Sequence, residues 1–224
     1  MDFLNRLMSL LNGDMNKPVA YQSFAESWFH YLALILTVLA AIAAATRLKN
    51  ASEKKIKIFL ISMASLMLVF EVYKQLNFSY NVGWGYQWYA FPFQFCSTPM
   101  YVALVAGLLS KGKVQNALFS FLGTYGLFAG AAVMLYPATV FINTIGINMQ
   151  TMVHHGSMTV IGVAMLTRRV KLQHRSILPA TAVFVVLVVM AMLMNLIHNT
   201  YIQNGTFNMF FINPQFDNGL PILD

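Results

Sequence analysis

Six apolar stretches, each near the length of a membrane-spanning helix, constrain this chain more than any other feature. They cover Trp28–Thr46, Ile56–Tyr73, Phe91–Leu109, Val114–Leu135, Thr151–Leu166 and Leu178–Leu196. A helix needs about 20 predominantly apolar residues to cross a bilayer. Charged residues make up 9% of the 224 residues, too few to cover a soluble particle, in which about a quarter is usual. The sequence therefore predicts an all-α membrane protein with a single bundle of six transmembrane helices.

Short polar links between these stretches leave no room for a second domain. We expect a membrane domain over residues 24–199, an N-terminal segment over 1–23 and an extracytoplasmic tail over 200–224. The N-terminal segment has apolar residues at helical spacing as far as Asn12-Gly13, which favours an amphipathic helix on the membrane surface. A disordered tail is the alternative.

The basic residues fall unevenly on the links. Three alternate links carry eleven of them, whereas the other side has only Arg6, Lys17 and Lys74. Cytoplasmic loops are enriched in Lys and Arg, so both termini are expected outside the cytoplasm. The charge then indicates anionic lipid as the partner at the cytoplasmic face, and it does not indicate nucleic acid. The eleven are Arg47, Lys49, Lys54, Lys55, Lys57, Lys111, Lys113, Arg168, Arg169, Lys171 and Arg175.

Reactive side chains gather at the outer ends of the predicted spans. Ionisable groups at membrane depth are costly and usually face a site or a cavity, so convergence of several of them predicts a functional site. Cys96 is the only cysteine, which excludes an internal disulfide and a cysteine-based zinc cluster. The other members of this set are His30, Glu71, His154, His155 and His198.

Cys96 and the histidine pair are placed at matched depth from one leaflet, as a nucleophile and a base require. Pro92 suits the first turn of a helix, and Pro99 is expected to kink that helix and free the Phe95 carbonyl. The alternative is a small buried cysteine beside two hydrogen-bonded helix histidines. We expect supporting or oxyanion-holding roles for Gln94, Glu71, Asn195 and His198.

The segment Phe91-Pro92-Phe93-Gln94-Phe95-Cys96 resembles the Leu-Pro-Leu-His-Leu-Cys motif of the YwaF-like bacterial integral membrane proteins. The His155-Gly156 pair and the segment Gly205–Phe211, leading to Pro214, are also similar to that family. Two departures stand out: Gln94 replaces the motif histidine, and the usual Asn-Tyr order of the tail is altered to Phe207-Asn208.

This resemblance implies lipid acyl chemistry. Animal relatives of the family are membrane acyltransferases that remodel ether phospholipids through a cysteine thioester, and more distant relatives hydrolyse fatty acid esters. It implies Cys96 as nucleophile, His155 or His154 as base, a phospholipid or lysolipid substrate and a location in the bacterial cytoplasmic membrane. We prefer His155, because the His-Gly pair carries the resemblance and Gly156 is expected to leave open space beside it.

Three functions remain open at this point. The leading one is a lipid acyltransferase or transacylase without metal or other cofactor, and no protein partner is identifiable. The second is a metal-dependent membrane hydrolase with ligands drawn from the histidines and Glu71, although no H-x-x-x-H spacing occurs. The third is a non-enzymatic membrane protein that binds lipid or a small molecule.

Overall fold

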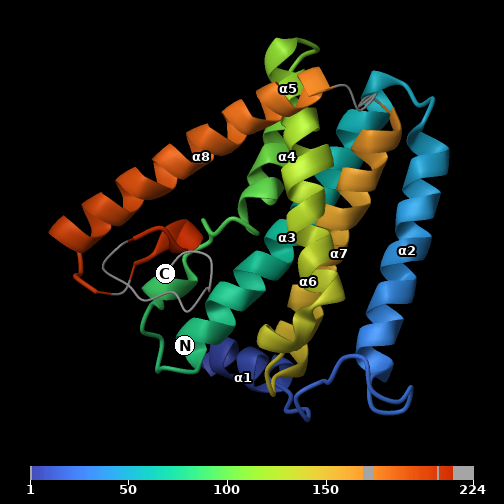
Figure 1. The fold of residues 1–224 in the computed structure, drawn as a ribbon. Coiled ribbons are helices and arrows are strands. Elements are labelled where there is room, and N and C mark those ends of the chain that lie inside the picture. The colour runs from blue at the N-terminus through green and yellow to red at the C-terminus, as the bar shows by residue number, and fades with distance from the viewer. Residues whose placement is uncertain (1, 169–173, 206, 214–224) are drawn as a thin grey trace.

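The structure, a computed structural model, describes residues 2–168, 174–205 and 207–213. The described residues form helices and no strands (Figure 1). Short helical turns, among them η1 (Trp88–Ala90) and η4 (Met209–Phe211), lie in the links and the tail. The π-helical turn η2 (Leu122–Gly126) joins α5 to α6. The main helices are α1 (Asp2–Leu11), α2 (Trp28–Leu48), α3 (Glu53–Tyr80), α4 (Thr98–Leu108), α5 (Lys113–Phe121), α6 (Leu127–Leu135), α7 (Ile145–Arg168) and α8 (His174–Tyr201).

Each of the six apolar stretches contains helix, and four of the helices in the described part are long and apolar enough to cross a membrane. These are α2, α3, the continuous stretch Lys113–Leu135 and α8 from Ile177. The chain is therefore a multi-pass membrane protein. The count of six spans stays a prediction, because α4 has 11 residues, about 16 Å of helix, and α7 is not among the four helices that are long and apolar enough to cross a membrane.

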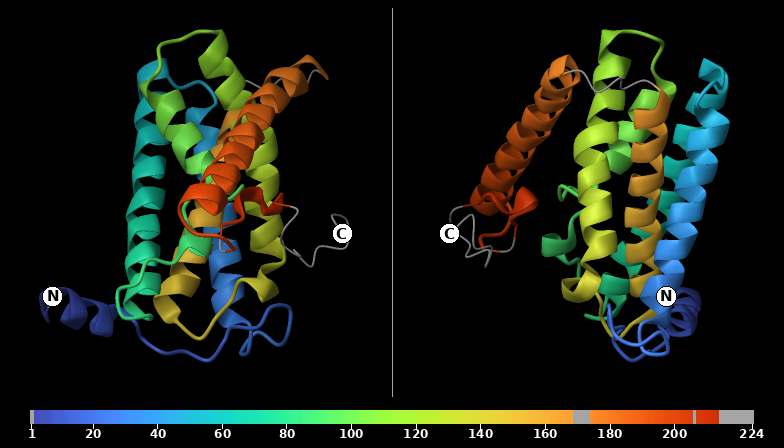
Figure 2. Two further views of the ribbon diagram at one scale, coloured as in Figure 1. Left: turned by 90° about the vertical axis from the view of Figure 1, so that its left-hand side faces the viewer. Right: turned by 45° about the vertical axis from the view of Figure 1, so that its right-hand side comes forward.

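α7 is the central helix of the bundle. It packs against α2, α3 and α6, and fifteen of its 24 residues are buried (Figure 2). Burial explains why this helix carries polar residues at membrane depth, since they face other helices rather than lipid. α8 behaves differently: it leans away from the other helices along most of its length and packs mainly against α5 (Figure 1).

Glycines bring α6 and α7 into close contact. A methyl group at Gly130 would lie 2.7 Å from the Met158 Cβ, and one at Gly162 would lie 2.5 Å from the Leu127 Cβ. Side chains at these positions would force the helices apart, as at other small-residue helix interfaces in membranes. This close approach fixes the rotation of α7, and with it the directions of His154 and His155.

The third apolar stretch departs from its predicted form. Helix α4 begins at Thr98 with Ser97 as its N-cap residue, so the prediction that Pro92 lies in a first helical turn is wrong. The predicted kink at Pro99 is also wrong. Pro99 lies in the first turn of α4, where its missing N–H would have no helical partner anyway. The Phe95 carbonyl is not free, because the Thr98 hydroxyl donates to it at 3.0 Å.

The N-terminal segment forms the helix that its amphipathic pattern predicts. Asn5 Oδ1 accepts a 2.8 Å hydrogen bond from the Trp84 indole, and Asn12 Oδ1 accepts one of 2.8 Å from the Asn77 amide. Met8 is the buried residue of this helix. These contacts hold α1 against the end of α3, so the alternative of a disordered tail is wrong.

The basic links lie together at one end of the bundle. The links after α2 and α4 are at the end opposite to α1 and to the links after α3 and α6 (Figures 1 and 2). Arg168, near the end of α7, donates to the Leu48 carbonyl at 3.0 Å, which places the last turns of α7 and α2 side by side. The charge asymmetry of the sequence is therefore also an asymmetry of the folded protein.

This arrangement makes the orientation testable. In a Cys96→Ser background, cysteines at the exposed positions Asn16 and Asn204 are expected to react with an impermeant maleimide on intact cells, because the positive end should face the cytoplasm. A cysteine at the exposed Lys111 should react only after permeabilisation. Labelling of Lys111→Cys alone on intact cells would reverse the orientation.

Candidate functional site

Cys96 lies between Pro92 and Pro99, in a turn that comes directly before α4. The Gln94 carbonyl accepts from the Ser97 amide at 2.8 Å and from the Thr98 amide at 3.2 Å, which closes the turn immediately before α4. Cys96 is half-buried and has no disulfide partner. The cysteine therefore lies at the entrance to a helix and is neither fully buried nor fully exposed.

His154 contacts this turn from α7. Its Nε2 atom lies 3.0 Å from the Cys96 carbonyl oxygen. A carbonyl oxygen only accepts, so Nε2 carries the proton in the neutral ring and Nδ1 carries the lone pair. Nδ1 is buried and has no hydrogen-bond partner among the described residues. The imidazole is therefore fixed at one edge and has a free basic nitrogen at the other.

His155 points differently, as expected for adjacent helix positions about 100° apart. Its Nδ1 atom lies 2.7 Å from the Thr151 carbonyl, one turn earlier in the same helix. Gly156 lines an apolar cavity between α2, α3 and α7, although a methyl group there would lie 2.7 Å from the Thr37 hydroxyl oxygen on α2. Of the two histidines, His154 is the one that contacts the Cys96 segment.

A buried ion pair on α3 completes the polar cluster. The Lys74 ammonium lies 2.8 Å from Glu71 Oε1, as their spacing allows. Gln75 donates to the same oxygen and to the Ala90 carbonyl, both at 2.7 Å. Glu71 Oε2 is buried without a partner among the described residues.

Both charges of this pair are close enough to act on Cys96, and the charge of Glu71 is close enough to act on Tyr101 of α4. Lys74 also acts on both histidines. Lys74, Gln75 and Tyr101 were not predicted as site residues, because nothing in their spacing relates them to Cys96. The helices α3, α4 and α7 and the turn before α4 contribute to one polar cluster, which consists of Glu71, Lys74, Cys96, Tyr101 and His154.

Gln94 and Asn195 hold the C-terminal tail. The Gln94 amide donates to the Asn208 carbonyl at 3.0 Å and accepts from the Phe210 N–H at 2.8 Å. Asn195 on α8 does the same with both backbone groups of Met209, at 3.0 and 2.7 Å. Each amide uses its oxygen and one of its two N–H groups to hold the backbone of the tail, so both fit a supporting role.

His198 packs in an aromatic cluster rather than beside Cys96. Its ring stacks on Phe207, with centroids 4.3 Å apart, and lies 4.5 Å from Trp88. Both ring nitrogens are buried without hydrogen-bond partners among the described residues. The cluster joins the end of α8, the tail and the link before Cys96.

His30 lies in a third environment. Its Nε2 atom is 2.8 Å from the Met134 carbonyl, and its ring meets Tyr21 edge to face. In the part of the chain that the structure describes, no group of three or more His, Cys, Asp or Glu side chains is arranged to hold a metal ion. The contacts of His30 and His198 are with groups other than Cys96 and His154, and convergence of these two histidines with Glu71, His154 and His155 on one site stays a prediction.

Comparison with known proteins places the chain in a family. A model of the TMEM164 family matches residues 23–223, which include the whole polar cluster and the tail. The chain belongs to the TMEM164 family. This assignment agrees with a multi-pass membrane protein, whereas a specific relation to the YwaF-like proteins stays a prediction. No curated protein and no solved structure matches the chain.

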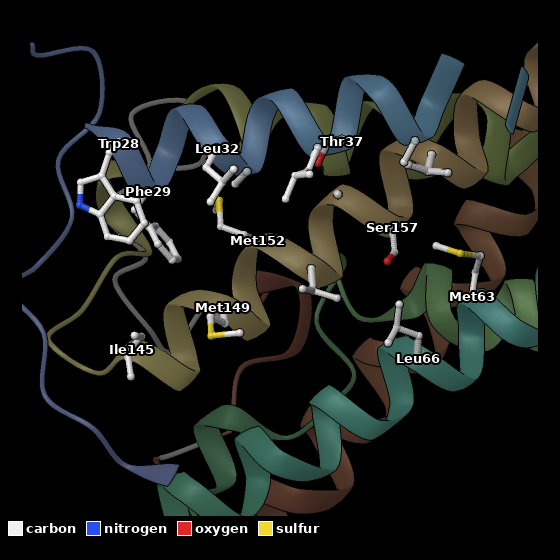
Figure 3. Close-up of a pocket in the computed structure, with 16 residues that line it drawn as sticks. Trp28, Phe29, Leu32, Thr37, Met63, Leu66, Ile145, Met149, Met152 and Ser157 are labelled. Carbon is white, nitrogen blue, oxygen red and sulfur yellow. The ribbon is translucent and has the colours of Figure 1, made fainter. Parts of the chain in front are cut away.

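Two apolar cavities lie between the helices of this TMEM164-family chain. One, of about 880 Å³, lies between α4, α5 and α8 and is bordered by Phe91 and Phe93 of the Cys96 segment. The other, of about 470 Å³, lies between α2, α3 and α7 (Figure 3). Thr37 and Ser157 bring hydroxyl groups to the lining of the second cavity, which is otherwise apolar and includes Leu32, Met63 and Met152. Both cavities are lined mainly by apolar side chains, and the first reaches the polar cluster at Tyr101.

The tail contacts lead to a prediction about stability. Replacing Asn195 with alanine removes both hydrogen bonds to Met209 and leaves buried backbone groups unpaired, which costs about 1–3 kcal/mol for each unpaired group. We expect a lower thermal unfolding temperature in detergent and faster amide exchange over residues 207–213. Asn204→Ala, an exposed position beside the same tail, is the control and should change neither. Unchanged amide exchange in Asn195→Ala would contradict the supporting role.

Proposed function

We propose that this protein is a membrane lipid acyltransferase or transacylase in which Cys96 is the nucleophile and His154 is the base. The observation that carries the proposal is the contact of His154 with the Cys96 turn, which leaves the Nδ1 lone pair of the ring free. Family membership supports it, because TMEM164 is the family of the animal ether-lipid acyltransferases.

In the first half-reaction His154 Nδ1 takes the proton of the Cys96 thiol, and the sulfur attacks the ester carbonyl of a phospholipid. The tetrahedral intermediate collapses as the ester C–O bond breaks. The leaving lysolipid oxygen takes the proton back from the imidazolium, and the acyl group remains on Cys96 as a thioester.

In the second half-reaction His154 takes the proton of an acceptor hydroxyl, whose oxygen attacks the thioester carbonyl. The C–S bond breaks, and the Cys96 sulfur recovers a proton from the imidazolium. The ammonium of Lys74, held by Glu71, lies near enough to stabilise the negative charge that develops in both steps. Gln94 and Asn195 act as positioning residues, since they tie the tail to the Cys96 segment and to α8.

His155 is assigned a supporting role, in place of the base that the sequence resemblance favoured. Its Nδ1 proton is used by the Thr151 carbonyl, and its ring packs 5.5 Å from the His154 ring. We assign α4 and α7 to membrane crossings, which makes six, with both termini extracytoplasmic and anionic lipid along the basic end. The bacterial cytoplasmic membrane remains the proposed location.

The proposal is tested by following acyl groups between lipids. Purified protein in vesicles that contain a phospholipid with a deuterated acyl chain and an unlabelled lysolipid should produce a diacyl lipid from the lysolipid, measured by mass spectrometry. Water as acceptor would release the deuterated fatty acid instead and would identify a hydrolase. Absence of both products, with lipid still bound to the protein, would favour a non-enzymatic lipid-binding protein.

A further inference from the structure

The larger apolar cavity is a groove along one face of α8. Residues at positions three and four apart on α8 line it, from Pro179 through Ala182 and Leu187 to Met194. The opposite wall comes from α4 and α5, including Val105 and Ala117. The groove exists because α8 leans away from the bundle, so that its inner face is not filled by α4 (Figure 1).

One end of this α4–α5–α8 groove lies at the candidate active site. Phe93 and Tyr101, which line that end, lie three residues before and five residues after Cys96. Tyr101 is also within electrostatic reach of Glu71, so it belongs both to the groove wall and to the polar cluster. The opposite end lies at the start of α5 and α8, near Val114 and Pro179.

The groove is long enough to hold a single lipid tail. Pro179 and Met194 are fifteen residues apart, which corresponds to about 22 Å along the helix. A lipid tail in one leaflet covers about half of a hydrocarbon core that is about 30 Å thick. The wall is apolar except for the Tyr101 hydroxyl near Cys96 and Lys113 at the far end, so at membrane depth hydrocarbon is the material that can fill it.

We infer that the α4–α5–α8 groove binds the acyl chain that Cys96 accepts, and that its far end limits the length of that chain. The inference rests on the proposed function for the transfer step, whereas occupation of the groove by a lipid tail does not depend on it. Ala117 and Ala182, with small side chains near the far end, leave the space that a long chain would need.

The test of occupation uses phosphatidylcholine vesicles in which one acyl chain ends in a diazirine. After irradiation, cross-links should concentrate on Val105, Ala117 and Ala182 rather than on Val185, an exposed α8 residue that does not line the groove. Ala182→Phe should lower cross-linking at Val105 and Ala117 about tenfold by overpacking the groove. Val185→Phe, which adds the same ring outside the groove, should not. Equal labelling of both faces of α8 would overturn the inference.

The test of chain length uses an equal mixture of lauroyl and stearoyl phospholipids and measures the acyl group found on Cys96. Ala182→Phe should lower the stearoyl adduct about tenfold relative to the lauroyl adduct, whereas Val185→Phe should leave the ratio unchanged. An unchanged ratio in Ala182→Phe would overturn the assigned chain-length limit. If no adduct forms with either lipid, the proposed function fails, and cross-linking still decides whether a lipid tail occupies the groove.

Discussion

Replacing Cys96 with serine is expected to abolish acyl transfer, with a fall in rate on the order of 10⁴-fold or more, as when other enzymes lose their nucleophile. Cys96 is the only thiol in the chain, so no neighbouring sulfur can take over its role. A serine hydroxyl is a far weaker nucleophile near neutral pH than a cysteine next to a base. The measurement is transfer of a deuterated acyl chain to a lysolipid in vesicles.

The thermal unfolding temperature shows whether the Cys96→Ser variant is still folded. The substitution changes one atom of a half-buried side chain and leaves the Cys96 carbonyl, which His154 contacts, in place. The thermal unfolding temperature in detergent should therefore stay close to that of the unchanged protein. If Cys96→Ser keeps half of the transfer rate, Cys96 is not the nucleophile.

Replacing His154 with alanine is expected to lower acyl transfer by about 10²–10⁴-fold, the usual contribution of a general base. The matched control is His155→Ala on the next position of the same helix, which removes the same ring from an equally buried site. His155→Ala should keep transfer within about tenfold, because its loss affects packing more than proton transfer. The reverse ranking would assign the base to His155.

A second variant distinguishes the role of His154 as a base from its hydrogen bond to the Cys96 carbonyl. In His154→Gln the side-chain amide can still donate to the Cys96 carbonyl, but an amide cannot take the thiol proton. We expect this variant to retain the unfolding temperature and to lose transfer as completely as the alanine variant. Restored transfer in His154→Gln would mean that His154 only positions the Cys96 turn.

Much of the fold could be predicted from the sequence, because the bilayer imposes a length and a composition on each span. The apolar stretches that became α2, α3, the Lys113–Leu135 stretch and α8 were identified in this way. The start of α4 was not, since an all-round apolar stretch has no period that marks where a helix begins. Pro99 lies in the first turn of α4. A proline is compatible with a helix start and also kinks a helix in its interior, so the sequence alone did not tell which of the two Pro99 does.

The sequence could predict which residues belong to the candidate site better than it could predict how their side chains are arranged. Matched depth related Cys96 to the histidine pair, but the choice between His154 and His155 depends on the rotation of α7, which contacts at Gly130, Gly162 and Gly156 fix. The roles of Gln94 and Asn195 could not be predicted either, because their partners are backbone groups of the tail. Gln94 lies more than a hundred positions in the sequence from the tail residues that it binds.

The central claim is that Cys96 carries an acyl group, and the most direct measurement is the intact mass of the protein after incubation with phospholipid in the absence of acceptor. We predict a gain of one acyl mass on the peptide that contains Cys96 and its removal by neutral hydroxylamine, which cleaves thioesters readily. The gain should be absent in Cys96→Ser and strongly slowed in His154→Ala. Lipid turnover that continues in Cys96→Ser, with no acyl mass on the unchanged protein, would contradict the claim.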